Sequence, residues 1–238
     1  MGARLDPIWQ GYPVVCIATG PSLTVEQCET VRQWRERDGC RVIAINDAYL
    51  LAPWADALYF ADVRWWQWQN DGIDRPLLGL KAREVKDRFR AFSGMRISIQ
   101  NGNGSVVDPR VVVMRNLSVD NGTQGQLSTD PTGIYTGQNS GYQAIGVAFL
   151  LGGNPIVLLG YDMKFSEDKR AHFFGEHPVK TSPETYRQFR FEFDRLAPRA
   201  VELGLQIVNA TSDSDLASFP RVSLESVVSC QTATALPA

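Results

Sequence analysis

The sequence has no long apolar run and no excess of charge of one sign. Its longest apolar stretch, residues 144–151, is too short to cross a bilayer, and the first residues carry no apolar signal core. Lysine plus arginine number 24 and aspartate plus glutamate 26, which gives a net charge of −2. This balance argues against non-specific binding to nucleic acid or to anionic membranes. We therefore expect a soluble, cytoplasmic protein without a membrane span.

Several motifs are also missing. The four cysteines include no Cys-x-x-Cys pair, which leaves a zinc ribbon or a dithiol site without support and favours reduced thiols packed as small apolar side chains. The first apolar run is not followed by Gly-x-Gly-x-x-Gly, and the chain lacks Gly-x-x-x-x-Gly-Lys. A dinucleotide dehydrogenase and a P-loop kinase are therefore both disfavoured.

Short apolar runs that end in glycine, asparagine or aspartate alternate with segments of helical spacing. The expected buried strands are residues 13–19, 41–45, 57–61, 95–100, 111–115, 155–160 and 205–208. The expected helices span residues 24–38, 141–151 and 182–204. Strands that are apolar on both faces and alternate with helices predict one Rossmann-like α/β domain over residues 1–238. We expect a mainly parallel sheet with helices on both faces.

Two segments lack this pattern. Residues 120–137 are rich in glycine, serine, threonine and aspartate, which predicts a long inserted loop. Loops of this length in compact domains are often functional, so we expect this one to order over a bound ligand as a lid. Residues 228–238 are expected to form a flexible tail.

Small and polar residues follow several of the expected strands. In a parallel sheet the carboxyl ends of the strands form the ligand site, and a helix that starts there offers free N–H groups to a phosphate. We therefore predict a nucleotide pocket made by Gly20, Pro21, Ser22, Asn46, Asp47, Asp62, Ser140, Gly141 and Asp162. The competing interpretation is that these residues only form turns and cap helices.

The only two histidines of the chain lie together in the segment 172–177. A neutral imidazole is the usual general base for a hydroxyl group near pH 7, so His172 and His177 are the candidate catalytic residues, with Glu176 as an alternative base. Their spacing is not that of a zinc helix and no third ligand is near in sequence, so no metal site is expected. Ordinary hydrogen-bonded loop histidines are the competing interpretation.

The ordered set of these motifs resembles the sialyltransferases of glycosyltransferase family 42, and equally their uncharacterised relatives in bacteriophages and prophages. The resemblance covers most of the chain and is carried by residues 15–23, 43–46, 59–62, 136–141, 156–162, 172–177, 209–211 and 219–220. It implies a modified Rossmann-type fold and an inverting, metal-independent transfer of a sugar from a nucleotide-linked donor, which in that family is linked to cytidine monophosphate. The protein would then be phage-encoded and work in the host cytoplasm, and a homo-oligomer is compatible with this.

The resemblance also implies roles for individual residues. The turn 20–22 and the helix start at Ser140 and Gly141 would hold the donor phosphate, and Asn46 and Asp62 would contact the ribose or the base. A histidine of the segment 172–177 would deprotonate the acceptor hydroxyl. No cofactor is implied beyond the nucleotide-sugar donor.

The sequence departs from the sialyltransferase pattern at three places. Thr19 and Asp62 stand where those enzymes have asparagine, and the tyrosine pair after the Gly-x-Asp strand is absent, so the donor sugar need not be sialic acid. Asp62 and the turn 20–23 also resemble archaeal 6-hydroxymethylpterin diphosphokinases. Those enzymes transfer diphosphate from ATP with Mg²⁺, and a carboxylate at a phosphate site is expected where a divalent cation bridges the two. A Mg²⁺-dependent diphosphokinase acting on a small alcohol is therefore one alternative, and a nucleotide-binding phage module without catalysis is another.

Overall fold

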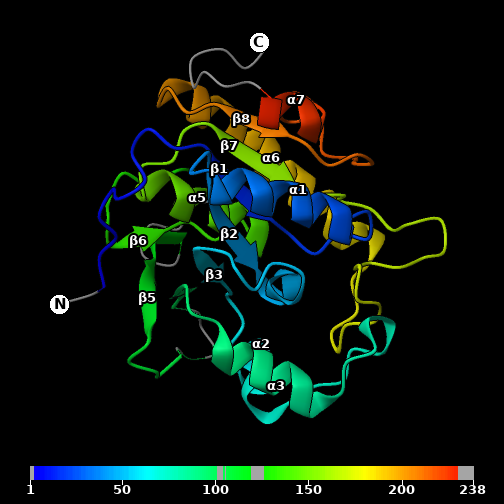
Figure 1. The fold of residues 1–238 in the computed structure, drawn as a ribbon. Helices are drawn as coiled ribbons and strands as arrows, with labels where there is room; N and C mark the ends of the chain where they lie inside the picture. Colours follow the sequence, from blue (N-terminus) through cyan, green and yellow to red (C-terminus); the bar gives the residue numbers. More distant parts are fainter. Residues whose placement is uncertain (1–2, 101–103, 105, 119–125, 230–238) are drawn as a thin grey trace.

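A computed structural model describes residues 3–100, 104, 106–118 and 126–229 of the protein. Its centre is an eight-stranded sheet in the order β6-β5-β4-β3-β2-β1-β7-β8, in which every neighbouring pair is parallel (Figure 1). The strands are β1 (Val14–Ile17), β2 (Arg41–Ile45), β3 (Ala57–Tyr59), β4 (Met95–Ile99), β5 (Val111–Asn116), β6 (Gly133–Ile134), β7 (Ile156–Leu159) and β8 (Ile207–Asn209). The predicted fold class, a parallel α/β sheet with helices, is confirmed.

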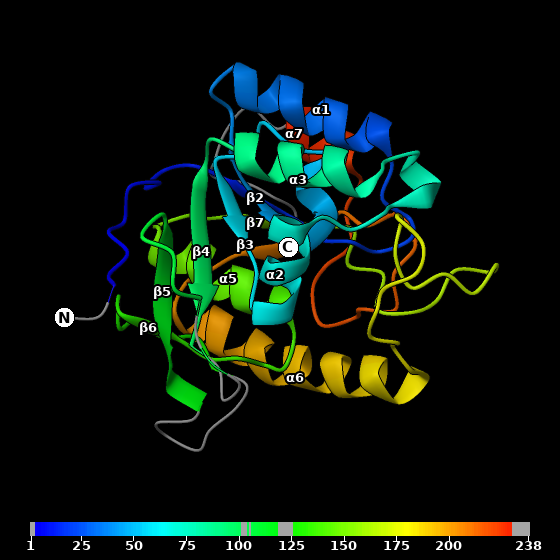
Figure 2. The same cartoon turned by 90° about the horizontal axis from the view of Figure 1, so that it is seen from below.

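Helices cover both faces of the sheet (Figure 2). One face carries α1 (Val25–Glu36), α3 (Ala82–Ala91) and α7 (Leu224–Ser229), and the other carries α5 (Ser140–Leu150) and α6 (Pro183–Glu202). Alternate residues of each strand enter separate cores: Val15 and Ile17 of β1 pack towards α1, whereas Val14 and Cys16 pack towards α5. Two buried faces explain why the central strands β1 and β7 are apolar at every position.

The remaining helices lie near the carboxyl ends of the strands. They are α2 (Val63–Asp71) and the 3₁₀ turns η1 (Asn46–Leu50) and η2 (Pro76–Leu78). Within the described ranges, no helix is both long and apolar enough to span a bilayer. The described cysteines are all buried free thiols, as expected for small apolar side chains: Cys16, Cys28 and Cys40.

Two segments differ from the sequence-based prediction. Residues 120–125 of the expected loop 120–137 lie outside the described residues, but the rest of the loop contains β6, whose two residues pair with the end of β5. A two-residue strand has no periodicity of its own and exists only through this pairing. The expected tail 228–238 begins inside α7, and its residues from 230 on lie outside the described part of the chain.

The strand order positions a ligand site. From β1 the chain continues to β2 and β3 on one side, and it later places β7 and β8 on the other side of β1. The chain leaves β1 towards β2 and leaves the neighbouring strand β7 in the opposite direction, towards β8. Two neighbouring strands with connections of this kind have a crevice at their carboxyl ends, where ligands of this fold class bind. The crevice expected between β1 and β7 is the place where the predicted residues gather.

Candidate functional site

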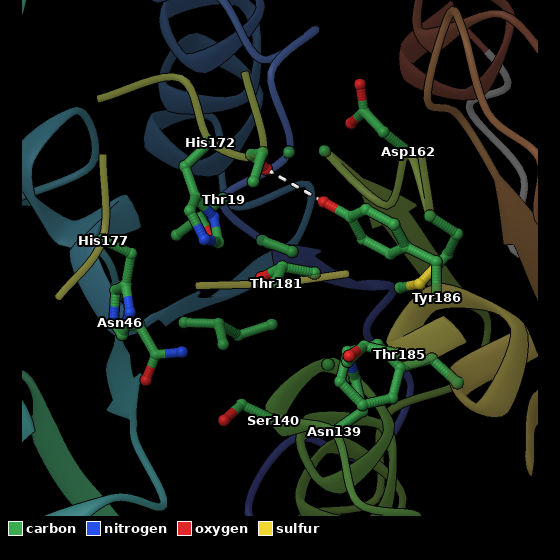
Figure 3. A pocket seen from close by; sticks show the side chains of 18 of the residues that line it. Thr19, Asn46, Asn139, Ser140, Asp162, His172, His177, Thr181, Thr185 and Tyr186 are labelled. Atoms are coloured by element: carbon green, nitrogen blue, oxygen red, sulfur yellow. Dashed lines mark hydrogen bonds between the residues drawn. The ribbon is translucent and has the colours of Figure 1, made fainter. Parts of the chain in front are cut away.

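A cavity of about 440 Å³ lies at the carboxyl ends of β1, β2, β3 and β7, beside the first residues of α5. Its volume is in the range typical of small-molecule sites. Most of the predicted residues line it: Gly20, Pro21, Asn46, Asp47, Asp62, Ser140, Gly141, Asp162, His172 and His177. Figure 3 shows His172, His177 and Asn46 on one side of the cavity and Thr185 and Tyr186 on the other.

Unusual backbone conformations are concentrated at this cavity. Five non-glycine residues of the described chain have a positive φ, and three of them line the cavity: Asn46 at 50°, Gln138 at 54° and Met163 at 53°. Such conformations are unfavourable for residues with a Cβ and persist where the surrounding structure fixes them, often at ligand sites. This observation, which no sequence motif shows, supports the cavity as the functional site.

The loop after β1 is held by Asp162 at the end of β7. The backbone N–H of Ser22 donates to Asp162 Oδ1 at 2.8 Å. A Cβ on Gly20 would lie 1.8 Å from Asp162 Oδ2, so only glycine allows this approach. Burial raises the pKa of Asp162 to about 6, despite the hydrogen bonds from Ser22. Ser22 was expected to contact a phosphate, but it is not among the lining residues and its N–H is bound to Asp162.

The N-terminus of α5 opens onto the floor of the cavity. Asn139 caps the helix, because its side chain accepts the N–H of Tyr142 at 3.0 Å. The neighbouring Ser140 and Gly141 line the cavity. The first N–H groups of a helix have no acceptor within the helix and carry the positive end of its dipole, so this end is suited to an anion.

Asp47 has a structural role that the sequence did not reveal. It is fully buried, and its Oδ1 accepts from Nε of Arg75 at 2.7 Å while its Oδ2 accepts from Nε1 of Trp65 at 2.7 Å. Each oxygen of the carboxylate therefore accepts a hydrogen bond from the protein, so Asp47 holds Trp65 and Arg75 in place, and its predicted contact with a nucleotide stays a prediction. Arg75 itself was not predicted, since a single arginine in an irregular segment carries no sequence signal.

Asp62 is also paired. Its carboxylate caps α2 by accepting the N–H of Arg64 at 2.8 Å, and it forms an ion pair with the Arg64 guanidinium at 2.9 Å. Partial burial acts to raise the pKa of Asp62, but the hydrogen bonds and the charge of Arg64 outweigh it and lower the pKa. The carboxylate is ionised, and its charge is balanced by that of Arg64.

The imidazole of His172 lies at the cavity wall, in contact with the end of β1. Its Nδ1 is 3.1 Å from Oγ1 of Thr19, and its ring stacks on Phe174 with the ring centres 4.9 Å apart and the planes at 4°. Burial lowers the pKa of His172 to about 4, and a positive charge on His177 lowers it further. His172 is therefore neutral at pH 7, which a base requires.

The second histidine has a different environment. The ring centres of His172 and His177 are 5.5 Å apart, and the ring of His177 also meets Trp68 edge to face at 5.6 Å. Its Nδ1 lies 3.0 Å from both the N–H and the carbonyl oxygen of Val179. Glu176, the alternative base, is exposed and is not among the lining residues.

Other parts of the wall were not predicted. The first turns of α6 contribute Thr185, Tyr186 and Phe189, and the hydroxyl of Tyr186 donates to the carbonyl of Ala171 at 3.3 Å (Figure 3). The start of α6 was predicted from Ser182 and the proline that follows, but its position beside the cavity depends on packing. The described residues 126–137 do not line the cavity, so their role as a lid stays a prediction.

The fold is that of a Rossmann-like α/β protein, and its candidate ligand site is the cavity at the carboxyl edge of the sheet. Its fold is similar to that of the MAf glycosyltransferase from Magnetospirillum magneticum AMB-1, with a TM-score of 0.57 and 16% sequence identity. The match covers 94% of this chain but 36% of that protein. A GH31 α-xylosidase from Xanthomonas citri matches with a TM-score of 0.22 and 10% identity, covering 93% of this chain and 25% of that one, and supports no likeness of fold. No protein-family model matches the sequence, and no curated protein matches it.

Proposed function

We propose that the protein is a glycosyltransferase that moves a sugar from a nucleotide-sugar donor to a hydroxyl group of an acceptor. The observation that carries this proposal is one cavity in which a helix N-terminus, suited to a phosphate, lies with a histidine that is unprotonated at pH 7 and so can accept a proton. The similarity in fold to a glycosyltransferase supports it. The resemblance to family 42 suggests a donor linked through a nucleoside monophosphate.

Two of the three carboxylates that line the cavity are paired with an arginine, which favours an anionic donor. Asp47 is neutralised by Arg75 and Asp62 by Arg64, so neither carboxylate presents an unbalanced negative charge to a phosphate. The phosphate would lie at the helix start formed by Ser140 and beside the Gly20 loop. Asn46 would then face the ribose or the base from the end of β2.

The chemistry follows from this arrangement. The acceptor hydroxyl gives its proton to an imidazole nitrogen of His172, and its oxygen forms a bond to the anomeric carbon of the donor sugar. The bond between that carbon and the phosphate oxygen breaks, and the nucleotide leaves with the bonding electrons. A single displacement of this kind inverts the configuration at the anomeric carbon.

The Mg²⁺-dependent diphosphokinase is the weaker candidate. It needs carboxylate oxygens that are free to bind a divalent cation. Each oxygen of Asp47 accepts a hydrogen bond from the protein, and Asp62 is paired with Arg64. Asp162 lines the cavity with an oxygen, Oδ2, that has no hydrogen-bond partner, but in the described ranges no group of three or more histidine, cysteine or acidic side chains is placed to hold a metal. These side chains, as they are arranged, do not fit a bridging magnesium.

A binding screen separates the candidates. The melting temperature is measured with a panel of nucleotides and nucleotide sugars, each in EDTA and in MgCl₂. A ligand at about 100 times its Kd adds ~2.7 kcal/mol of stability. We expect stabilisation by a nucleotide or nucleotide sugar in EDTA, followed by transfer to a hydroxyl acceptor detected by mass spectrometry. Stabilisation by ATP that requires Mg²⁺ would instead support the diphosphokinase.

Two glycines of α5 provide a matched pair of variants for the donor site. A Cβ on Gly141 would lie 2.7 Å from the Tyr161 ring and 2.8 Å from Asn139 Oδ1, so Gly141→Ala should distort the helix start and abolish nucleotide binding. A Cβ on Gly146 meets Ile134 at an ordinary 3.4 Å. Gly146→Ala should leave nucleotide binding intact. Equal nucleotide affinity in the two variants would argue against a phosphate at this helix end.

The base is tested by the two histidine variants. We expect His172→Ala to lose about 10²–10⁴-fold in kcat with little change in the Kd of the donor, because the imidazole acts in the proton transfer and not in donor binding. If neither His172→Ala nor His177→Ala falls by more than a few-fold, a histidine base is ruled out. Unchanged function in both variants would favour a non-catalytic binding module.

A further inference from the structure

The residues that line the cavity fall into two chemically different sets. The strand ends and the start of α5 contribute mostly polar groups, among them Thr19, Asn46, Asp47, Asp62, Gln138, Asn139 and Ser140. Residues 163–189, which connect β7 to α6 and include the first turns of α6, contribute the two histidines, Lys180, two threonines and five large apolar or aromatic side chains: Met163, Phe174, Val179, Tyr186 and Phe189. The polar set suits the ribose and the phosphate of a donor, whereas the apolar side chains have no role in binding those groups.

The base lies at the apolar end of the cavity. Phe174 stacks on the ring of His172, and the hydroxyl of Tyr186 donates to the carbonyl of Ala171, the residue before His172. Figure 3 shows His172 and Tyr186 towards one end of the view and Ser140 towards the other. Because the donor phosphate is expected at Ser140, the hydroxyl that gives its proton to His172 lies in the part of the cavity that Tyr186 lines.

Four of these side chains form a surface that we call the apolar wall: Met163, Val179, Tyr186 and Phe189. The rings of Tyr186 and Phe189 pack edge to face with their centres 6.5 Å apart. Val179 is tied to the second histidine, because its N–H and its carbonyl oxygen each lie 3.0 Å from Nδ1 of His177. The apolar wall therefore joins the start of α6 to the segment that carries both histidines.

The histidine segment also carries apolar side chains that remain exposed. Val179 is 43% exposed although it lines the cavity. Leu77 is 59% exposed and packs on the same segment, since a Cβ on Gly175 would lie 2.9 Å from its Cδ1. Single exposed apolar side chains are common on protein surfaces, but a group of them beside a cavity is typical of a site that binds an apolar ligand.

We propose that the apolar wall binds the acceptor, and that the acceptor is an alcohol whose hydroxyl group is carried close to an apolar group of about the size of a phenyl ring. The apolar group leaves water by packing on the wall, and the hydroxyl then faces His172. The reaction of this hydroxyl rests on the proposed glycosyl transfer. The binding of the apolar group does not, so it can be measured without a donor.

The experiment compares ligands that differ only in the group attached to a sugar. The probes are the methyl and the phenyl β-glycosides of glucose, galactose and N-acetylglucosamine, and isothermal titration calorimetry of the full chain in EDTA gives the Kd of each. Burial of most of a phenyl ring corresponds to about a tenfold gain in affinity or more. We expect the phenyl glycoside of at least one sugar to bind more tightly than its methyl glycoside by about this factor.

The chain offers matched variants of the apolar wall. Val179→Ser and Phe189→Ser remove apolar surface from the wall. The controls are Val201→Ser and Phe191→Ser, because these two side chains are 77% and 53% exposed on α6 and do not line the cavity. The preference for the phenyl glycoside should fall by about threefold to tenfold in the wall variants and stay unchanged in the controls. Circular dichroism verifies folding, and Val179→Ser carries the test alone if Phe189→Ser does not fold.

Transfer assays extend the test to the reaction. With a donor that the protein uses, the wall variants should raise KM for a phenyl glycoside acceptor and leave KM for the donor unchanged. Donor KM values that rise instead would mean that the wall binds the donor, which overturns the proposal. Methyl and phenyl glycosides of equal or undetectable affinity, or a phenyl preference that survives in both wall variants, would also overturn it.

The two proposals can fail separately. A phenyl preference that depends on Val179 and Phe189, in a protein that transfers no sugar from any donor of the panel, would overturn the glycosyltransferase proposal and leave the apolar subsite established. Transfer with the same KM for methyl and phenyl acceptors would do the reverse.

Discussion

The carboxylate of Asp162 accepts the backbone N–H of Ser22 at 2.8 Å and thereby joins the end of β7 to the loop that follows β1. This contact lies between the ends of the two neighbouring parallel strands. Burial acts on the two groups in opposite directions: it raises the pKa of Asp162 to about 6 and lowers that of His172 to about 4. Burial therefore shifts each group towards its neutral form relative to the unfolded chain, so that at pH 7 His172 is neutral while most of Asp162 is still ionised.

The first prediction concerns Asp162. Its pKa is about 6 in the folded protein against an ordinary value of 3.8, so the folded state binds more protons between these pH values than the unfolded chain. The resulting stabilisation is complete below about pH 4 and is lost as the pH rises through 6. Asp162→Asn keeps an oxygen for the N–H of Ser22 but removes the charge. Its free energy of unfolding relative to the wild type should increase by about 2 kcal/mol between pH 4 and pH 8.

Urea denaturation at a series of pH values measures this difference. A gap between Asp162→Asn and the wild type that stays constant from pH 4 to pH 8 would show that the carboxyl group of Asp162 titrates normally. Asp194→Asn is a suitable control, because its carboxylate lies on the exposed side of α6, where it accepts from the hydroxyl of Ser218.

The second prediction is the opposite pH dependence for His172. Its pKa is lowered from 6.5 to about 4, so its contribution to stability is complete above pH 6.5 and is lost as the pH falls through 4. In His172→Gln this contribution is absent. The stability of the variant relative to the wild type should therefore improve by about 2 kcal/mol between pH 7 and pH 4. Denaturation curves that show the same pH trend for His172→Gln and Asp162→Asn would contradict the assignment.

The third prediction compares two ion pairs at the same cavity. The side chains of Arg75 and Asp47 are 2% and 1% exposed, whereas those of Arg64 and Asp62 are 58% and 41% exposed. Arg75→Met leaves a buried carboxylate without its counter-charge, which should destabilise the protein by about 3–5 kcal/mol. Arg64→Met should change the stability by less than about 1 kcal/mol, because water screens the exposed pair.

Chemical denaturation at pH 7 tests this contrast. Adding Asp47→Asn to Arg75→Met should recover part of the lost stability, since the double variant buries no unpaired charge. Similar losses in Arg75→Met and Arg64→Met would mean that Asp47 is not charged in the folded protein.

Most of the sheet could be predicted from the sequence because its signals are local. Each central strand is a short apolar run with a turn residue at its end, and α1 begins at a capping box in which Thr24 and Gln27 bond to each other's backbone. The helices α3 and α7 were not predicted, because their sequences lack such signals. In α3 the N-cap position is held by Lys81 and most of the surface is charged, and α7 is only six residues long.

The site was predictable only in part, for the same reason. Residues at the ends of parallel strands must meet at one edge of the sheet, so Gly20, Asn46 and Asp162 could be placed together without a structure. Pairings between distant segments could not be predicted from the sequence. The partner of Asp47 is 28 positions away and that of His172 is 153 positions away, and nothing in either segment points to the other. The sequence therefore indicated which residues gather at the cavity but not which of its carboxylates are paired within the protein.

The last prediction uses the closeness of the two histidines. A positive charge on His177 contributes to the low pKa of His172, after the larger effect of burial. His177→Gln removes that charge and keeps a polar side chain, so the pKa of His172 should rise above about 4 while remaining below its ordinary value of 6.5. A titration of the His172 ring by NMR measures this directly. If the pKa of His172 is the same in His177→Gln and the wild type, the two rings do not interact electrostatically, and burial alone keeps the base neutral.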